Sequence, residues 1–158
     1  MTCDPQDVEP AEILGSARSG RWLVTCDHAS NAVPGWIGGS LGIDAADMTR
    51  HIAFDVGAAG LSRALAERLD SPSILSTFSR LVIDANRGED DPTLIMRLYD
   101  GTVVPANRTL TADDRARRLS LYHGYHTAYA RLAARRPDTV ICAIHSFTPA
   151  LRGRSPRP

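Results

Sequence analysis

The chain has 158 residues, a length typical of a single domain. Hydrophobic residues make up 43% and charged residues 23%, a globular composition that argues against wholesale disorder. The 18 Arg balance the 18 Asp and Glu, so the basic excess typical of nucleic-acid-binding proteins is absent. Because the sequence contains no Lys, lysine Schiff bases and phosphate-binding lysines are excluded.

The cysteines indicate a reducing compartment. Cys3, Cys26 and Cys142 are odd in number and form no CxxC motif, so they do not make a disulfide framework. The sequence shows no signal peptide and no apolar stretch of the roughly 20 residues that span a bilayer. We therefore expect a cytoplasmic protein with neither a nucleic-acid nor a membrane partner.

The N-terminal quarter contains one clear strand. Residues 1–20 are acidic, contain Gly and Ser, and lack periodicity, so we expect an N-terminal arm that precedes a domain over 21–158. Residues 21–26 are mostly apolar and end before a polar turn, which predicts a buried strand. Glycines and a proline then predict a loop over 31–42.

The middle of the chain predicts a helix and two strands. Apolar residues near helical spacing predict a helix over 55–69, with Asp55 as its N-cap. Short apolar segments at 73–78 and 81–85 predict strands.

A long loop and a helix–strand pair complete the pattern. Residues 88–110 carry two Gly and two Pro, which predicts a loop long enough to be functional. Thr111 to Asp114 resembles a capping box at the start of a helix that runs to about Arg136. Residues 139–144 read as a buried strand. Alternating strands and helices favour an α/β fold with a largely parallel sheet.

Polar residues follow three of the predicted strands. His28 lies two residues beyond the first, Asn86 and Arg87 follow 81–85, and His145 directly follows 139–144. In open α/β sheets ligands bind beyond the carboxyl ends of the strands. Two imidazoles and a guanidinium are therefore expected to converge on one rim of the sheet.

The two histidines are candidate metal ligands. Neighbouring strands lie roughly 4.8 Å apart, so two strand-end histidines can share one ion. A catalytic zinc site takes about three protein ligands and keeps one position open for water. Asp27, Asp55 and Asp84 are candidates for the third ligand by their location. The alternative is that each histidine is a hydrogen-bonded structural residue.

Arg80 and Arg87 flank an apolar segment, where an unpaired charge is costly. The planar guanidinium matches a carboxylate, so these residues form either a clamp for a substrate carboxylate or internal salt bridges. The candidate internal partners are Asp84, Glu89 and Asp90. His51 stands shortly before the predicted helix, where it could support the metal ligands.

Other nucleophiles and histidines fit structural roles better. Cys26 and Cys142 lie inside apolar runs, so we interpret both as core residues rather than as thiol nucleophiles. His123 and His126 are three apart on the long helix, a spacing that metal pairs can use. His126 lies on the apolar stripe of that helix and is interpreted as a core histidine.

Several segments, in order along the chain, resemble the N-formylglutamate amidohydrolase family. They are TCDHASNAVP (25–34), HIAFDVGA (51–58), SRLVIDANR (79–87), YHGYH (122–126) and HSFTP (145–149). The resemblance implies a fold like that of the zinc carboxypeptidases, in the phosphorylase/hydrolase-like class. This is a three-layer αβα fold with a mixed, mostly parallel twisted sheet.

The resemblance also implies a reaction and roles for named residues. The reaction is hydrolysis of an N-acyl amino acid, with N-formyl-L-glutamate giving formate and glutamate. His28 and His145 fall where such folds bind zinc or another divalent metal. Asn31 stands where carboxypeptidase relatives place a glutamate ligand, and Asp55 is the alternative third ligand. Asn86 and Arg87 resemble the pair that holds the substrate carboxylate.

Two roles in the reaction remain to be assigned. Arg80 is the candidate that stabilises the oxyanion, and His51 is the other candidate catalytic residue. Members of the family usually continue well beyond the last residue of this chain and carry an acidic general base in that part. We therefore expect a C-terminally shortened domain with weak or no activity, and a non-catalytic module that binds carboxylate ligands is the alternative. An exposed sheet edge would also permit homo-oligomers.

Overall fold

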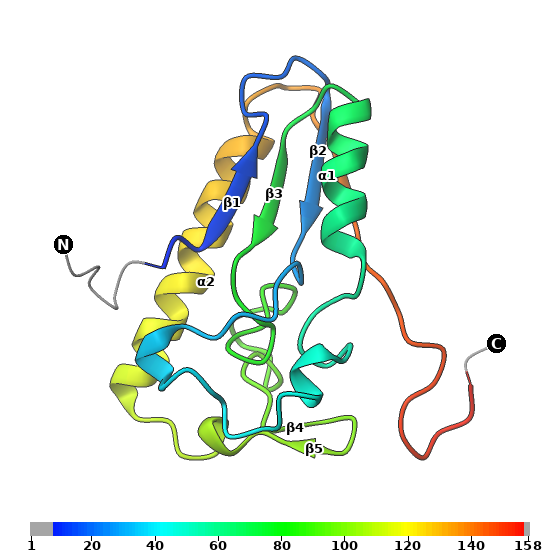
Figure 1. The fold of residues 1–158 in the computed structure, drawn as a ribbon. Coiled ribbons are helices and arrows are strands. Elements are labelled where there is room, and N and C mark those ends of the chain that lie inside the picture. The colour runs from blue at the N-terminus through cyan, green and yellow to red at the C-terminus, as the bar shows by residue number, and fades with distance from the viewer. Residues whose placement is uncertain (1–7, 157–158) are drawn as a thin grey trace.

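The computed structural model describes residues 8–156, so Cys3 lies outside the described part. Four strands form one sheet in the order β1 (Ala11–Leu14), β3 (Ser73–Ser76), β2 (Trp22–Cys26) and β6 (Val140–Ala143). The central strand β2 pairs in parallel with β3 and β6, whereas β1 is antiparallel to β3. The sheet is therefore mixed and mostly parallel, as expected. Figure 1 shows β2 and β3 running toward the same end of the molecule.

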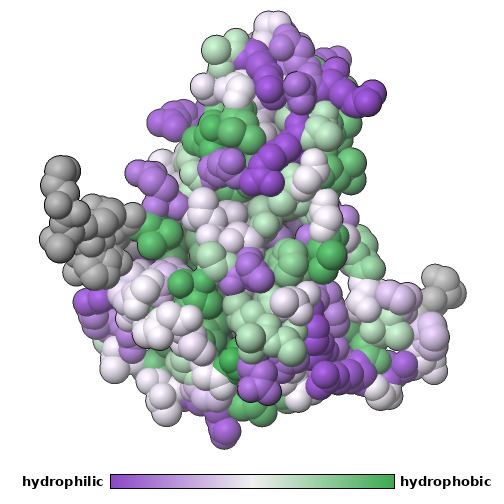
Figure 2. All heavy atoms as spheres, viewed as in Figure 1, coloured by the Kyte–Doolittle hydropathy of each residue, from purple (hydrophilic) through white to green (hydrophobic). Residues whose placement is uncertain are grey.

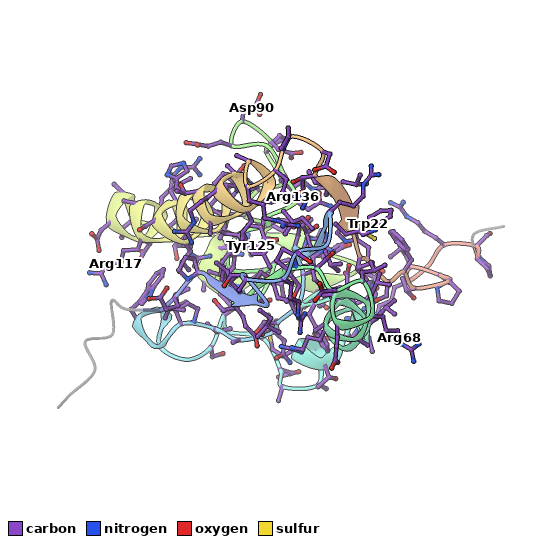
Figure 3. All side chains as sticks on the ribbon, turned by 90° about the horizontal axis from the view of Figure 1, so that it is seen from above. Trp22, Arg68, Asp90, Arg117, Tyr125 and Arg136 are labelled. Atoms are coloured by element: carbon purple, nitrogen blue, oxygen red, sulfur yellow. The ribbon has the colours of Figure 1, made fainter. Side chains whose placement is uncertain are left out.

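Helices cover the two faces of this sheet. Seen from above in Figure 3, α1 (Ala58–Arg68) and α2 (Ala112–Ala133) lie on opposite sides of the strands. Successive residues of a strand point to opposite faces, so β2 serves both layers. Leu23 belongs to the main core beside α2, and Cys26 packs with Ala58 of α1. The arrangement confirms the predicted three-layer αβα fold.

The surface is mixed in polarity. On the face that Figure 2 shows, hydrophilic and hydrophobic residues lie side by side, with hydrophilic residues gathered over the upper end. Neither α1 nor any other helix within residues 8–156 is long and apolar enough to cross a bilayer.

Helix α2 begins as the sequence predicts. Thr111 is the N-cap and accepts a hydrogen bond from the backbone N–H of Asp114 at 3.1 Å. The Asp114 carboxylate accepts from the Thr111 backbone in return, which completes the capping box. The helix ends at Ala133, slightly before the expected end at Arg136.

The predicted long loop contains small elements. Residues 88–110 include a two-stranded hairpin and a single 3₁₀ turn, and two further 3₁₀ turns lie earlier in the chain. The hairpin is β4 (Leu98–Tyr99) and β5 (Thr102–Val103), and the turns are η1 (Gly35–Ile37), η2 (Asp47–Thr49) and η3 (Pro105–Asn107).

Two expectations about the N-terminal half are wrong. The arm predicted over 1–20 contains β1, because its residues 11–14 pair with β3 at the edge of the sheet. Asp55 does not cap α1. The N-cap is Gly57, which adopts a left-handed φ of 80°, and the carboxylate of Asp55 contacts two histidines instead.

Residues 81–85 are buried but do not form the predicted strand. Side chains rather than a neighbouring strand satisfy the carbonyls of Leu81 and Val82. Asn107 donates to the carbonyl of Leu81 at 2.8 Å, and Arg118 donates to the carbonyl of Val82 at 2.8 Å. Asn107 also accepts from Arg118 at 2.7 Å. This buried Asn–Arg pair fixes the segment that leads into Asn86 and Arg87.

We expect Asn107→Ala to lower the free energy of unfolding by about 2 kcal/mol, because it leaves buried polar groups without partners. Asn107 is fully buried and also donates to the carbonyl of Met96 at 2.6 Å. Urea unfolding followed by circular dichroism measures the change. Thr109→Ala, at an exposed position two residues away, is the control. Equal midpoints for the two variants would contradict the assigned role of Asn107.

Candidate active site

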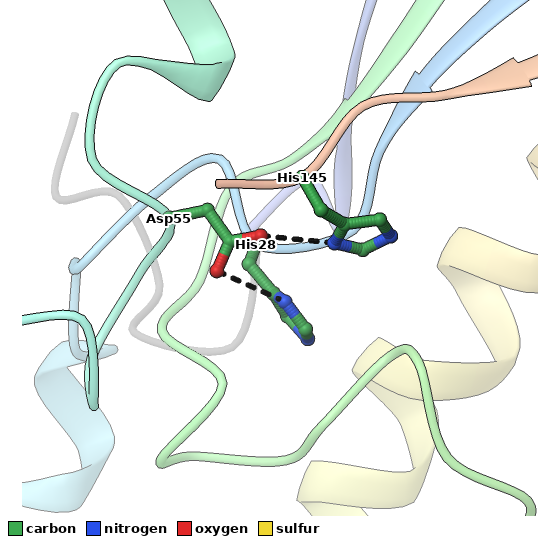
Figure 4. A group of neighbouring side chains, drawn as sticks. All are labelled: His28, Asp55 and His145. Carbon is green, nitrogen blue, oxygen red and sulfur yellow. Dashed lines mark hydrogen bonds and ion pairs between the residues drawn. The ribbon is translucent and has the colours of Figure 1, made fainter. Parts of the chain in front are cut away.

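The carboxyl ends of β2 and β6 bring His28 and His145 together, with ring centroids 5.3 Å apart. Asp55, from the segment that precedes α1, lies between them. Its Oδ2 is 2.9 Å from Nδ1 of His145, and its Oδ1 is 3.4 Å from Nδ1 of His28 (Figure 4). The predicted convergence of the two strand-end histidines therefore occurs, and the structure adds Asp55 from a third segment.

Backbone hydrogen bonds fix this arrangement. The N–H of Asp55 donates to the carbonyl of His28 at 2.9 Å, which ties the segment before α1 to the end of β2. The N–H of Ser146 donates to the Asp55 carboxylate at 3.3 Å. The three side chains are therefore held by the ends of separate elements rather than by a short sequence motif.

The three side chains fit a divalent metal ion. Their candidate ligand atoms lie within 4.8 Å of one another. Nδ1 of His28 is buried and has no hydrogen-bond partner, which is costly unless something binds its lone pair. Zinc takes imidazole nitrogen and carboxylate oxygen at about 2.0–2.2 Å in tetrahedral geometry, which separates ligands by roughly 3.4 Å. The 3.4 Å between His28 Nδ1 and Asp55 Oδ1 matches that separation.

Asp84 contacts the ring nitrogen of His28 that does not face Asp55. This carboxylate is fully buried, and its Oδ1 lies 2.6 Å from Nε2 of His28. An ionised carboxylate can only accept, so this contact places a proton of His28 on Nε2, while Nδ1 faces Oδ1 of Asp55 at 3.4 Å. Asp84 also accepts from Arg80 at 2.9 Å and from the backbone N–H of Asn86 at 2.9 Å. Carboxylates in this position orient metal-binding histidines.

The charges of the cluster stabilise one another. Burial would raise the pKa of Asp55, but the contacts with His145 and His28 and the charge of Arg80 hold this pKa well below its usual range. Burial likewise opposes ionisation of Asp84, and His28 and Arg80 outweigh it to lower its pKa. Both carboxylates are therefore ionised at neutral pH, as a cation site requires.

A cavity of about 240 Å³ opens beside this cluster. Its wall combines the three clustered residues with other predicted site residues and with the chain that follows β6. The lining residues are His28, His51, Asp55, Arg80, Asn86, Arg87, Tyr99, His145, Ser146, Phe147, Thr148 and Leu151.

The sequence left two roles open for the arginines, an internal salt bridge and a clamp for a substrate carboxylate. Arg80 fits the first role and Arg87 fits the second. Arg80 is largely buried, pairs with Asp84, lies 3.6 Å from Asp55 and stacks over the ring of Tyr99 at 5.2 Å. It is therefore an internal ion-pair partner that also faces the cavity. Arg87 is 41% exposed and approaches Asp84 only to 3.9 Å. Its guanidinium remains available for a ligand in the cavity.

His51 also lines the cavity, on the side of the β4–β5 hairpin. Its Nε2 lies 3.3 Å from the Asp100 carboxylate but makes no hydrogen bond. Burial lowers the pKa of His51, and the charges of Arg50 and Arg80 lower it further against the opposing effect of Asp100. The imidazole is therefore neutral at neutral pH.

Asn31 does not join the cluster. Its amide is exposed and donates to the carbonyl of Met48 at 2.9 Å, in a different hollow of the surface. The reason is that the chain leaves the sheet after His28, and the bond from the N–H of Ser79 to the carbonyl of Ala32 directs this loop away. Of the four candidates for the third ligand, only Asp55 groups with both histidines. Asp84 contacts His28 alone, and Asp27 approaches His145 alone.

Cys26, Cys142 and the two histidines of α2 lie outside the cluster. Burial raises the pKa of the Cys26 thiol to about 11, which leaves it protonated beneath α1. Cys142 is partly buried on β6. His123 pairs with Glu89 on the surface at 2.8 Å, and His126 lies 3.0 Å from the carbonyl of Ala85.

Sequence reasoning missed several residues near the cavity. Tyr99 and Asp100 come from the hairpin inside the predicted loop and contact Arg80 and His51. Tyr125 of α2 donates to Asp27 at 2.6 Å, although 98 residues separate the two. The apolar stripe predicted on this helix runs through His126 and does not include Tyr125, so the sequence indicated neither the burial of Tyr125 nor its partner.

Comparisons with known proteins agree with the family resemblance and with the fold. The N-formylglutamate amidohydrolase family matches residues 20–158. The crystal structure of gene product Atu2144 from Agrobacterium tumefaciens is 31% identical, with a TM-score of 0.86. The match covers 91% of this chain and 59% of that protein, so the chain spans little more than half of it. No curated protein matches the chain.

Proposed function

The chain belongs to the N-formylglutamate amidohydrolase family, and from this premise we propose that it serves metal-dependent hydrolysis of an N-acyl amino acid such as N-formyl-L-glutamate. The observation that carries the proposal is the buried, unpaired Nδ1 of His28 beside Asp55 and His145. This donor set opens into a cavity that also presents the guanidinium of Arg87.

His28, Asp55 and His145 would hold the metal, with zinc as the first candidate. A bound ion of this kind acidifies a water molecule and polarises the acyl oxygen. In the overall reaction the water oxygen bonds to the acyl carbon, the C–N bond breaks, and a proton passes to the amine nitrogen. The products are the free acid, formate for an N-formyl substrate, and the amino acid.

The other residues of the cavity would bind and orient the substrate. Arg87 and the amide of Asn86 would hold the substrate carboxylate. This contact would fix the orientation of the substrate in the cavity. Arg80 would add positive charge where the acyl oxygen becomes negative. Neutral His51 would accept or return a proton at the cavity wall.

A second candidate function is binding without turnover. Among the residues that the structure describes, Asp55 is the one carboxylate that lines the cavity, and it contacts both histidines. A second carboxylate that could serve as general base is therefore not present in the described wall. This observation favours a module that binds N-acyl amino acids through metal and Arg87 but does not release acid.

Arg87→Gln tests the carboxylate clamp that both functions share. A hydrogen bond to a charged group contributes about 1.5–3 kcal/mol, so we expect roughly 10- to 100-fold weaker binding of N-formyl-L-glutamate. Titration calorimetry on the zinc-loaded protein measures the affinity, and a formate assay on the same sample separates hydrolysis from binding. Arg97→Gln is the matched control, since Arg97 is exposed and lies outside this cavity. Equal affinities for the two variants would reject the clamp.

A further inference from the structure

Asp27 and Tyr125 form a buried pair that the proposed reaction does not use. The phenol of Tyr125 is fully buried and donates to Oδ1 of Asp27 at 2.6 Å. Figure 3 shows Tyr125 in the interior, between α2 and the sheet. Asp27 immediately precedes His28 and is itself only 8% exposed.

The surroundings of Asp27 are unusual for a buried carboxylate. Burying a carboxylate is costly unless a charge or several donors compensate it. Within residues 8–156 no guanidinium lies within ion-pair distance of Asp27, and its partners are Tyr125 and His145. Oδ2 of Asp27 lies 3.8 Å from Nε2 of His145. The carboxylate is therefore held by the phenol on one side and faces an imidazole on the other.

His145 thus stands between two carboxylates. Its Nδ1 is 2.9 Å from Asp55, and Figure 4 shows its other nitrogen pointing away from Asp55, toward α2. A neutral imidazole carries one proton. If a metal takes the lone pair of Nδ1, that proton resides on Nε2, where Asp27 is the carboxylate that can accept it. Asp84 faces Nε2 of His28 in a similar way but at hydrogen-bond distance, 2.6 Å, against 3.8 Å for Asp27 and His145.

We propose that Asp27 and Tyr125 are positioning residues for the metal site, in which Tyr125 orients Asp27 and Asp27 stabilises the Nε2–H form of His145. The inference rests on the proposed function, since it assumes that His145 binds a metal through Nδ1. It assigns a role to a Tyr on α2 that lies outside the cavity wall.

Asp27→Asn is the sharpest test, because it keeps the shape and the acceptor for Tyr125. Its amide presents a donor toward Nε2 and so favours the Nδ1–H tautomer, which cannot bind metal through Nδ1. Loss of such a supporting contact typically costs 10- to 100-fold in metal affinity, and we expect that loss in a zinc competition titration. Tyr125→Phe keeps Asp27 but removes the hydrogen bond that orients it, so we expect a smaller loss of zinc affinity, within about tenfold.

A spectroscopic readout separates positioning from general stability. ¹⁵N-histidine spectra of the zinc-loaded wild type should show His145 with its proton on Nε2. Tyr129→Phe is the matched control, since Tyr129 packs against Tyr125 one turn along α2. We expect it to leave zinc affinity and the His145 spectrum unchanged. Thermal melting of each metal-free variant reports folding.

The outcomes distinguish this inference from the proposed function. Wild-type protein that binds no zinc would overturn both. Wild-type protein that binds zinc, with unchanged affinity in folded Asp27→Asn and Tyr125→Phe, would overturn the positioning role alone. A His145 proton on Nδ1 in the loaded wild type would also overturn it. Weaker zinc binding in both variants, with Tyr129→Phe normal, would support it.

Discussion

His28→Ala is expected to abolish zinc binding, from about one ion per chain in the wild type to none. His28 contributes the buried Nδ1 that has no other partner, so its loss removes one of the three candidate ligands and leaves two, His145 and Asp55. Elemental mass spectrometry on protein purified in the presence of zinc measures the stoichiometry.

His123→Ala is the matched control for this experiment. His123 is an exposed histidine that pairs with Glu89 on the surface of α2, so its loss should not change the zinc content. His145→Ala should behave like His28→Ala, because both histidines belong to the cluster. Zinc retained at full stoichiometry in folded His28→Ala would mean that the ion binds elsewhere, and the proposed site would be rejected.

The sequence predicted the parts of the fold that depend on local patterns. The strands β2 and β6 are mostly apolar runs followed by polar residues, and the structure contains both, although β6 is a half-exposed edge strand rather than the predicted buried one. The convergence of His28 and His145 followed from their positions at strand ends, because parallel neighbours end at the same edge. The capping box at Thr111 is likewise a local pattern.

The errors occurred where distant residues decide the structure. Residues 81–85 have the composition of a strand, but Asn107 and Arg118 satisfy the carbonyls of Leu81 and Val82, and no local pattern reveals those partners. Asn31 was aligned to a ligand position by similarity, yet the bond between Ser79 and Ala32 directs that loop away from the cluster. β1 is too short and too polar at one position to stand out by periodicity.

In the candidate site, too, local patterns predicted some features and tertiary contacts determined the others. Asp55 was one of several acidic candidates, and only the tertiary bond from its N–H to the carbonyl of His28 places it between the histidines. The contacts of Asp100 with His51 and of Tyr125 with Asp27 join segments separated by long stretches of chain. Such contacts need the folded geometry, because residue type and spacing alone do not specify them.

Asp84→Ala is expected to be the most destabilising single substitution near the site. Asp84 is fully buried, and its removal takes away the carboxylate closest to His28 and Arg80, leaving them only the longer contacts with Asp55. Removing one member of a buried ion pair costs about 3–5 kcal/mol, so we expect a loss of that order in the free energy of unfolding at pH 7. Zinc affinity should also fall about 10- to 100-fold, because Asp84 orients His28.

The pH dependence of the destabilisation in Asp84→Ala identifies its cause. His28 and Arg80 lower the pKa of Asp84 below its unfolded value near 3.9, so its stabilising effect is complete above that pH. The effect disappears as the pH falls through the lower pKa of the folded state. The difference between wild type and Asp84→Ala in urea unfolding should therefore be large at pH 7 and shrink in acid. Asp90→Ala, which changes an exposed carboxylate nearby, should show little difference at either pH. A loss in Asp84→Ala that stayed constant down to acid pH would instead indicate a packing defect.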